Sequence, residues 1–535
     1  MSTSRKVKMP SNFDTHIERR AAHERARNHG ARIASVPGAH GALYSSLRTG
    51  LLSMGDQLDE THLVPMLTFS RNAVRDALRL LADEGIVTRR PRNGTIVVAT
   101  SVDVPLDNGL GWGEKSVPHR EVVVTEQRWV QATPVTRRFL ETDNGVVHVT
   151  EAVDMFDGRP SMIHTRFTIN GAARPLLASP ATHLDFRQSF LRTYGCGLDT
   201  IDCWVDATEA DERTAGVLRT EPGTPLIVKS RVLRAMDGRP REYSISHYIA
   251  AEVSFSAGTD GGAGDGPGEA SPTRVPSRPT SYSNSPDSSI SDRRRASADL
   301  HAQLRAAIRE GLYRVGDRLS EEEIAEAYAV SRSTVRLALN QLAGEGIIGR
   351  SRHRATVVVG SIVNCTLNGG VFYPPDSVDQ YCDASLASQS IPTPPFVREL
   401  LRTDDPSTRI DEYLISRDGR PTSVYIRYTS TDVARRPLTC GGGEDFSSLF
   451  RRTYGQPVGR IVHNLHAVRA SGQLARRLAV EQGSVLLLSE RLIHDGQGAP
   501  RELSHTYHVA SGVSLASHFE FDAGPNTDSS IVCGV

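Results

Sequence analysis

The chain has 535 residues, a length typical of three or four domains. Hydrophobic residues make up 38% of it, no apolar run reaches membrane length and no signal peptide opens it, so we expect a soluble cytosolic protein without a membrane partner. The formal net charge is zero, which by itself gives no indication of nucleic-acid binding.

Residues 1–37 carry many more basic than acidic side chains, which predicts a mobile arm. A solvated tail and non-specific contact with DNA phosphates both remain open for it. Residues 38–100 then show the pattern of three helices and a β-hairpin. Leu43 lies at the start of the first helix, Arg71 to Glu84 form the third, and Thr88 to Val98 give strand, basic turn and strand. This order predicts a winged helix-turn-helix, with one helix for the major groove of DNA and a wing for its backbone or minor groove.

Residues 110–255 alternate strand and helix patterns. Residues 146–169 and 225–250 read as β-hairpins, because apolar residues alternate on both sides of an Asp-Gly turn. Thr208 to Leu218 predicts a helix between these hairpins. An antiparallel sheet with helices on one face, an α+β fold, is the expected result. Residues 256–296 are dense in Gly, Ser, Pro and Thr, which predicts a flexible linker.

Residues 297–360 repeat the winged pattern, with helices at Leu300 to Gly311 and Glu321 to Tyr328. The next stretch reads VSRSTVRLALNQLAGEGIIGR from Val330. Ser331 can cap a helix there, and apolar residues from Val335 to Leu342 line one face. The outward face is left with arginine, serine and asparagine donors, which suit the edges of bases in the major groove. Residues 365–522 repeat the larger α+β domain, including a helix from Gly472 to Leu478, and residues 523–535 form a tail.

The two halves of the chain are copies of each other. The segment FSRNAVRDALRLLADEGIVTR begins at Phe69 and matches the one that begins at Val330, a period of about 260 residues (330 minus 69 is 261). The motifs DGRP and RTYG recur at the same spacing. The chain is therefore a duplication of a two-part module, and the period is far too long for a solenoid repeat.

The first winged segment departs from the second in ways that predict weaker DNA binding. Pro65 falls inside its second helix, where proline costs about 3 kcal/mol, and we expect a loss of about one turn between Leu47 and Gly55. Asn72 and Ala73 replace two hydroxyl residues of the second copy. We therefore expect the first copy to bind DNA weakly, or to serve mainly as a pairing surface.

The winged segments resemble the GntR family of bacterial transcription regulators, on the residues VSRSTVRLALNQLAGEGII and SRNAVRDALRLLADEGIV. The rest of each half resembles the UTRA effector domain of the HutC subfamily, which shares its fold with chorismate lyase. The carrying pieces there are the DGRP hairpin, the RTYG segment, and a closing pattern that runs from Arg231 to Ser244 and again from Arg491 to Ser504. The resemblance implies a regulator that binds operator DNA and a small-molecule effector, without a metal or cofactor.

Carried onto matching positions, the resemblance implies two sets of site residues. The DNA-binding set is Ser331, Arg332, Ser333, Thr334, Arg336, Asn340, Arg350, Arg352 and Arg354 in the second copy, with Ser70, Arg71, Asn72, Arg75, Arg90 and Arg92 in the first. The effector-binding set is Arg231, Glu242, Ser244, Tyr248, Arg491, Glu502, Ser504 and His508. Family members that bind anions often carry Arg-x-Arg on the first hairpin. Ala152-x-Asp154 and Tyr413-x-Ile415 stand there instead, which argues against a phosphosugar.

Three further interpretations remain open. The halves can pair within one chain as a pseudo-dimer. The protein can be a sensor that has lost DNA binding, or, because its effector domains share a lyase fold, an enzyme. Two His-x-x-His pairs, at His463 and His505, suggest a metal, but residues three apart on a strand face opposite ways and no third ligand is evident. The six cysteines show no zinc spacing, which predicts reduced thiols.

Overall fold

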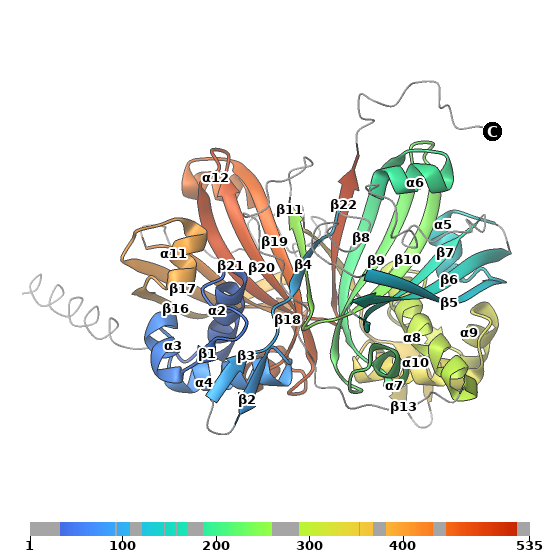
Figure 1. Cartoon of the computed structure of the whole chain (residues 1–535), viewed down its shortest axis with the longest axis horizontal. Helices are drawn as coiled ribbons and strands as arrows, with labels where there is room; N and C mark the ends of the chain where they lie inside the picture. Colours follow the sequence, from blue (N-terminus) through green and yellow to red (C-terminus); the bar gives the residue numbers. More distant parts are fainter. Residues whose placement is uncertain are drawn as a thin grey trace, which may run out of the picture.

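The computed structural model describes residues 33–90, 94–107, 120–143, 145–156, 158–169, 186–258, 288–351, 354–367, 381–431 and 446–521. Within these residues the chain forms two winged helix-turn-helix domains and two α+β effector domains, as the sequence predicts (Figure 1). The winged domains lie along one edge of the molecule and the effector sheets extend away from them toward the opposite edge. None of the helices described is long and apolar enough to cross a membrane.

The first winged domain contains α2 (Val36–Arg48), β1 (Gln57–Leu58), α3 (Glu60–Leu67), α4 (Arg71–Asp83), β2 (Val87–Arg90) and β3 (Gly94–Val97). Helix α2 begins inside the stretch that we expected to be an arm, because Ser35 caps it by accepting from the Gly38 N–H. Helix α3 continues through Pro65, so our expectation of a disrupted second helix is wrong. Three buried apolar residues of α3 offset the hydrogen bond that proline removes; they are Leu63, Val64 and Leu67.

The second winged domain contains α8 (Ser288–Arg309), β12 (Arg318–Leu319), α9 (Glu321–Ala327), α10 (Arg332–Gly344), β13 (Ile348–Ser351) and β14 (Arg354–Val358). Helix α8 begins within the stretch that we expected to be linker. The expected one-turn loss in the first copy is also wrong. Gly55 and Gly316 occupy the same turn, with φ of 91° and 99°, and their N–H groups bond the carbonyls of Val97 and Val358.

Effector domain 1 contains β5 (Arg120–Gln131), α5 (Pro134–Leu140), β6 (Val146–Phe156), β7 (Arg159–Thr168), α6 (Phe186–Tyr194), β8 (Leu198–Glu209), α7 (Glu212–Leu218), β9 (Pro225–Ala235) and β10 (Pro240–Ile249). Both predicted hairpins form, as β6–β7 and β9–β10. The predicted helix from Thr208 is shorter than expected. Thr208 still belongs to β8, and Asp211 caps α7.

Effector domain 2 repeats this order with β16 (Tyr381–Pro392), α11 (Pro395–Leu401), β17 (Ser407–Arg417), β18 (Arg420–Ser430), α12 (Phe446–Tyr454), β19 (Val458–Arg469), α13 (Gly472–Leu478), β20 (Val485–Asp495) and β21 (Pro500–Val509). Helix α13 has the bounds that the sequence predicts.

The two halves exchange their last strands. Strand β11 (Val253–Gly258) follows effector domain 1 but pairs with β19, and β22 (Val513–Glu520) follows effector domain 2 but pairs with β8. Short strands β4 (Val102–Pro105) and β15 (Val363–Thr366) add in parallel to β11 and β22. Each eight-stranded sheet is therefore built from both halves of the chain. Strand β11 runs to Gly258, beyond the boundary that we expected at residue 255.

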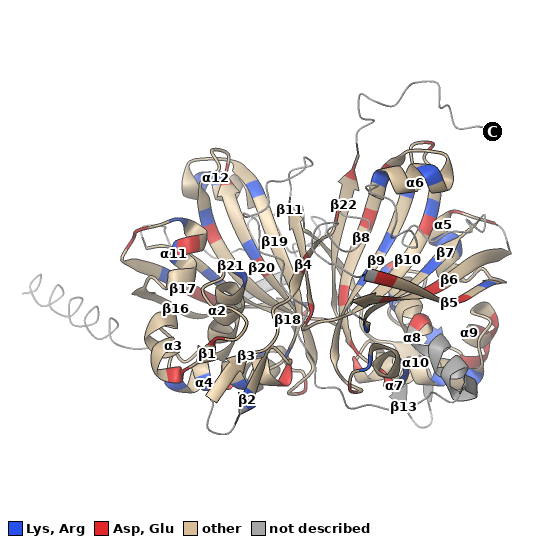
Figure 2. Cartoon of the chain, in the orientation of Figure 1, with Lys and Arg blue, Asp and Glu red and all other residues tan. Residues whose placement is uncertain are grey.

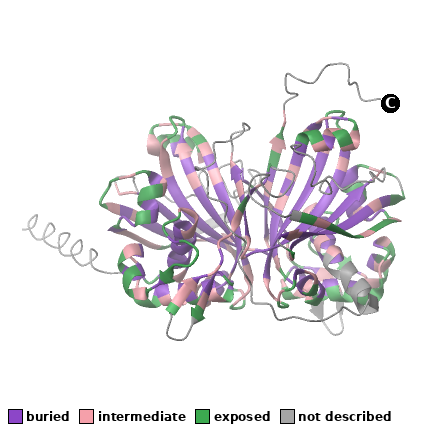
Figure 3. Cartoon of the chain, viewed as in Figure 1, coloured by how far each residue is buried: buried purple, intermediate pink, exposed green. Residues whose placement is uncertain are grey.

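Each winged domain packs on the effector domain of the other half. One hydrophobic core joins α2, α3 and α4 to α11, α13 and β21 of effector domain 2, through residues such as Leu43, Phe396 and Leu474. A second core joins Ala306 and Ala307 of α8 to effector domain 1. Buried residues lie along the strands of both sheets and on the helices below them (Figure 3). Each half of the chain therefore contacts the other in two ways, through its exchanged strand and through its winged domain.

Candidate functional sites

Helix α10 is the candidate recognition helix of the second half. The Ser331 hydroxyl caps it by accepting from the Thr334 N–H at 3.2 Å. Arg332, Ser333 and Arg336 are exposed, as is Asn340 one turn further on. Thr334 is buried, and its hydroxyl lies 2.8 Å from the Ser331 hydroxyl. The structure therefore places Thr334 in the helix cap and away from the exposed face on which we expected it.

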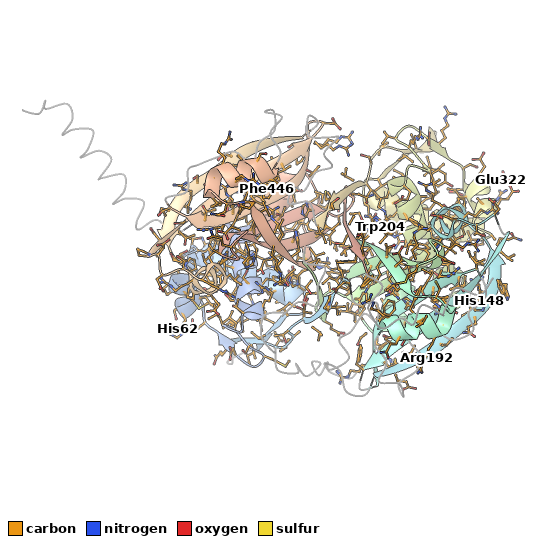
Figure 4. All side chains as sticks on the ribbon, turned by 90° about the horizontal axis from the view of Figure 1, so that it is seen from above. His62, His148, Arg192, Trp204, Glu322 and Phe446 are labelled. Carbon is orange, nitrogen blue, oxygen red and sulfur yellow. The ribbon has the colours of Figure 1, made fainter. Side chains whose placement is uncertain are left out.

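Glutamates of the preceding helix hold the arginines of both recognition helices. Arg336 donates to Glu321 at 3.0 Å, and Arg332 pairs with Glu322. In the first copy Glu60 alone accepts from Arg71 at 3.1 Å and from Arg75 at 3.0 Å. Such exposed pairs contribute only about 0–1 kcal/mol, so a DNA phosphate or base can replace the carboxylate. Seen from above, Glu322 lies at the opposite end of the molecule from His62 of α3 (Figure 4).

The other predicted DNA contacts are only partly described. Ser70 caps α4 by accepting from the Ala73 N–H at 3.2 Å, and Asn72 is exposed beside it. Arg92 and Arg352 lie outside the described residues. For the remaining wing residues the structure describes only the strand in which each stands, which is β2 for Arg90, β13 for Arg350 and β14 for Arg354.

The predicted effector residues of the first half meet on one face of the β9–β10 hairpin, beneath α6. The Arg231 guanidinium donates to Ser244 at 3.1 Å and to Glu242 at 3.2 Å. Tyr194, the tyrosine of the RTYG segment, donates to the other Glu242 oxygen at 3.2 Å, and burial raises its pKa. Arg166 of β7 lies 3.6 Å from the same carboxylate. Basic and acidic residues lie on neighbouring strands beneath both α6 and α12 (Figure 2).

Lys229 lies on this face as well, two residues before Arg231, and sequence reasoning missed it. Its side chain is 2% exposed and stands directly opposite Ser246 on β10. The ammonium lies 5.9 Å from the ring centre of Tyr248, a predicted effector residue. Burial, and then the charge of Arg231, lower its pKa to about 7. The sequence could have drawn attention to this residue, because Lys229 is one of only four lysines in the chain.

The second half builds the equivalent cluster with more internal pairing. Arg491 donates to Glu502 at 3.4 Å and to the Tyr425 hydroxyl at 3.2 Å, and Tyr425 donates to Glu502 at 2.6 Å. Arg427 donates to Asp411 at 3.0 Å and lies 3.8 Å from Glu502. Carboxylates thus neutralise both arginines.

The remaining predicted effector residues are buried on the same faces. Tyr248 packs edge-on against Phe255, with ring centres 5.1 Å apart. His508 lies 2.8 Å from the Ser423 hydroxyl, and burial lowers its pKa to about 3. The hydroxyl of Ser504 has no hydrogen-bond partner within the described part of the chain. Whether any of these residues contacts an effector stays a prediction.

The four rings of the His-x-x-His pairs are buried. Burial lowers the pKa of His463 to about 3 and that of His466 to about 4. His463 lies 2.9 Å from the Leu367 carbonyl, and His505 lies 2.8 Å from Ser45 of the first winged domain. Within the described ranges, no three histidine, cysteine or carboxylate side chains gather as metal ligands.

The two parts of each half match two known protein families. Residues 39–97 and 296–358 match the profile of the bacterial regulatory proteins of the gntR family, and residues 119–254 and 385–513 match the UTRA domain. The HTH-type transcriptional regulator Rv0792c of Mycobacterium tuberculosis is 27% identical over 229 residues, which are 40% of this chain and 81% of that protein.

Solved structures also resemble single parts of the chain. PhnF of Mycobacterium smegmatis is 24% identical and covers 40% of this chain and 96% of its own, with a TM-score of 0.27. A GntR-family regulator of Enterococcus faecalis is 19% identical and covers 26% of this chain and 98% of its own, with a TM-score of 0.22. Each of these relatives therefore matches no more than about half of this chain.

Proposed function

We propose that a single chain works as a complete pseudo-dimer, in which its two halves take the places of two subunits. The chain belongs to the gntR family of bacterial regulatory proteins, with a UTRA domain after each winged domain. It is a DNA-binding transcription regulator whose operator affinity responds to a small molecule in its effector domains. In the proposed arrangement, the two winged domains of one chain bind the two half-sites of one operator, in the bacterial cytoplasm.

The exchange of β11 and β22 is the observation that carries this proposal. In a chain with one module, the receiving sheet would have to come from a second molecule, as in a domain-swapped homodimer. Here both receiving sheets belong to the same chain. The exchanged strands contribute Phe255 and Leu515 to the core between the two effector domains. Exchange of these strands with a further chain would require this apolar core to open, which is costly.

A short series of contacts connects the candidate ligand site of effector domain 1 to the second recognition helix. In effector domain 1, Arg231 and Lys229 face the candidate ligand site, whereas Val228 and Val232 of the same strand pack in the core shared with α8. Glu345 caps the C-terminal end of α10, where it accepts from Arg305 of α8 at 2.6 Å and from Thr208 of β8 at 3.3 Å. A ligand that prefers one position of the sheet therefore shifts the position of α10 by its differential affinity for the two states.

The first winged domain is held to effector domain 2 by hydrogen bonds and by an ion pair between Arg48 and Glu490. Glu84 ends α4 as Glu345 ends α10, and accepts from the Arg469 N–H at 2.8 Å and from Tyr44 at 3.0 Å. Tyr507 donates to the Pro37 carbonyl at 2.8 Å, and Ser45 bonds Glu490. We propose that this domain binds DNA more weakly, because Asn72 and Ala73 replace two hydroxyl residues of the second copy, Ser333 and Thr334.

We propose binding rather than catalysis for the effector domains, because their arginines and carboxylates are paired with one another in the described sites. A sensor without DNA binding is disfavoured by the exposed Arg332 and Arg336 on α10.

A gel shift with the DNA upstream of the chain's own gene, at several salt concentrations, tests the proposed function. Specific binding with a steep salt dependence, weakened by Arg336→Ala, is the expected result. Absence of binding to every upstream or genomic fragment would favour the sensor or the enzyme instead.

A further inference from the structure

The Lys229 side chain is buried, and its ammonium lies close to aromatic rings. Its ammonium has no hydrogen-bond partner within the described part of the chain, and aromatic rings surround it, with the ring centre of Phe255 at 5.3 Å. An unpaired ammonium away from water is costly, so such a side chain either loses its proton or acquires an anion. The lowered pKa, about 7, places Lys229 between these two states near neutral pH.

The groups around Lys229 leave positive charge in excess. Arg231 and Arg166 already share the single carboxylate of Glu242. Of the other acidic groups, Asp107 acts on the ammonium from an exposed position, and Asp154 is buried on β6, three strands away in the sheet. Neither neutralises the ammonium as Glu242 neutralises Arg231.

The second half lacks this feature. Ser489 stands two residues before Arg491, where Lys229 stands two residues before Arg231, and it lies 3.2 Å from the ring nitrogen of His463. Both arginines of that half have a carboxylate partner, Glu502 for Arg491 and Asp411 for Arg427. The duplicated sites have therefore diverged in charge, and among the described residues of the two sites Lys229 is the extra buried cation.

We propose that effector domain 1 binds a small organic acid whose carboxylate pairs with the ammonium of Lys229, and that effector domain 2 does not bind this ligand. The inference rests on the proposed function, because it names the ligand class of the same effector site. The site holds three buried cations, Arg166, Arg231 and Lys229. Two buried carboxylates, Glu242 and Asp154, lie on the same sheet, so one further carboxylate balances the charge (3 minus 2 is 1). A phosphate dianion would bring one more negative charge beside Glu242 and Asp154, and Ala152 and Asp154 offer it no further cation.

The position of Lys229 also assigns the direction of the signal. Its strand neighbour Val228 packs in the core that contains Ala306 and Ala307 of α8. Occupation of this site therefore acts on the second winged domain, which has the more exposed recognition arginines.

Lysine-selective NMR on the full chain tests the proposal, because only Lys6, Lys8, Lys115 and Lys229 contribute signals. With 13Cε-labelled lysine, the Lys229 signal is assigned from its loss in Lys229→Met. The probes are benzoate, acetate, inorganic phosphate and the neutral analogue benzamide. We expect a saturable shift of the Lys229 signal with benzoate or acetate, none with benzamide, and no comparable shift of the other three lysines.

Thermal unfolding gives a second readout that does not need the assignment. The Kd of benzoate, obtained from the concentration dependence of the unfolding temperature, should rise about tenfold or more in Lys229→Met, because a hydrogen bond between charged groups is lost. The same Kd should be unchanged in Ser489→Ala. A Lys229 signal that no carboxylate moves would overturn the proposal, because the ammonium then pairs with no carboxylate ligand. Tighter binding of phosphate or benzamide than of benzoate would also overturn it. These measurements contain no DNA, so their outcome is independent of whether the protein binds an operator.

Discussion

The Thr208 hydroxyl of effector domain 1 lies 3.3 Å from the carboxylate of Glu345, the residue at which recognition helix α10 ends. Thr208 belongs to β8, the strand that also receives β22 from the other half. One side chain therefore connects the exchanged sheet to the candidate DNA-reading helix. The charges of His301 and Arg305 hold the pKa of Glu345 at about 2 despite its burial, so the carboxylate accepts this bond at every physiological pH.

Thr208→Val should loosen the end of α10 without unfolding the protein. The change keeps the shape of the side chain and removes one hydrogen bond, worth about 1 kcal/mol. We expect amide hydrogen exchange in the last turn of α10 to accelerate about fivefold. Helix α4 serves as the internal control, since Glu84 makes its own contacts with effector domain 2. Unchanged exchange in α10 would show that Thr208 does not hold the helix.

Glu322→Gln should increase operator affinity. The Glu322 carboxylate pairs with Arg332 and would lie near DNA phosphates when α10 enters the major groove. Its neutralisation frees the arginine and removes a repulsive charge, together worth about 1 kcal/mol or a few-fold in Kd. Glu326→Gln removes an exposed charge from the same helix and is the matched control. Equal gains in both variants would mean that only the net charge matters.

Arg332→Ala should weaken operator binding more than Arg71→Ala. An arginine that contacts a base contributes about 1–3 kcal/mol, and the first winged domain is expected to be the weaker reader. The two variants are compared by titration of one labelled operator at fixed salt. A larger loss for Arg71→Ala would reverse the assignment of the stronger and weaker reader.

Acid should destabilise the protein through its buried histidines. The unfolded chain binds protons on histidine below about pH 6.5, whereas the folded chain keeps His466 and His247 neutral down to about 4. Stability is therefore present above pH 6.5 and is lost as the pH falls toward 4. Chemical denaturation between pH 7 and pH 4 should show a shallower decline for His466→Gln than for the wild type. The exposed His62 is the control position, and His62→Gln should leave the slope unchanged.

Much of the fold could be predicted from the sequence, because the signals were local and occurred twice. Capping by Ser331 and the spacing of Val335, Ala338 and Leu342 predicted α10, and Asp-Gly turns predicted the hairpins. The cluster of Arg231, Glu242 and Ser244 could be predicted only through the family resemblance. Its neighbour Lys229 has no motif of its own, and became visible only through its burial.

The exchange of β11 and β22 could not be predicted, because the alternation of apolar residues is the same whichever sheet receives the strand. For the same reason the sequence does not indicate that each winged domain packs on the effector domain of the other half, because the apolar faces of the two winged domains are near copies. Glu60, Glu321 and Glu322 precede the recognition helices by about ten residues, so their pairing with arginines depends on the angle between two helices and not on sequence spacing.

The central claim, that one chain is a complete regulator, is tested most directly by light scattering on the purified protein, free and bound to an operator identified by gel shift. The account predicts the mass of one chain when free, and one chain per operator in the complex. A stable dimer of full chains in solution, or two chains on each operator, would contradict it.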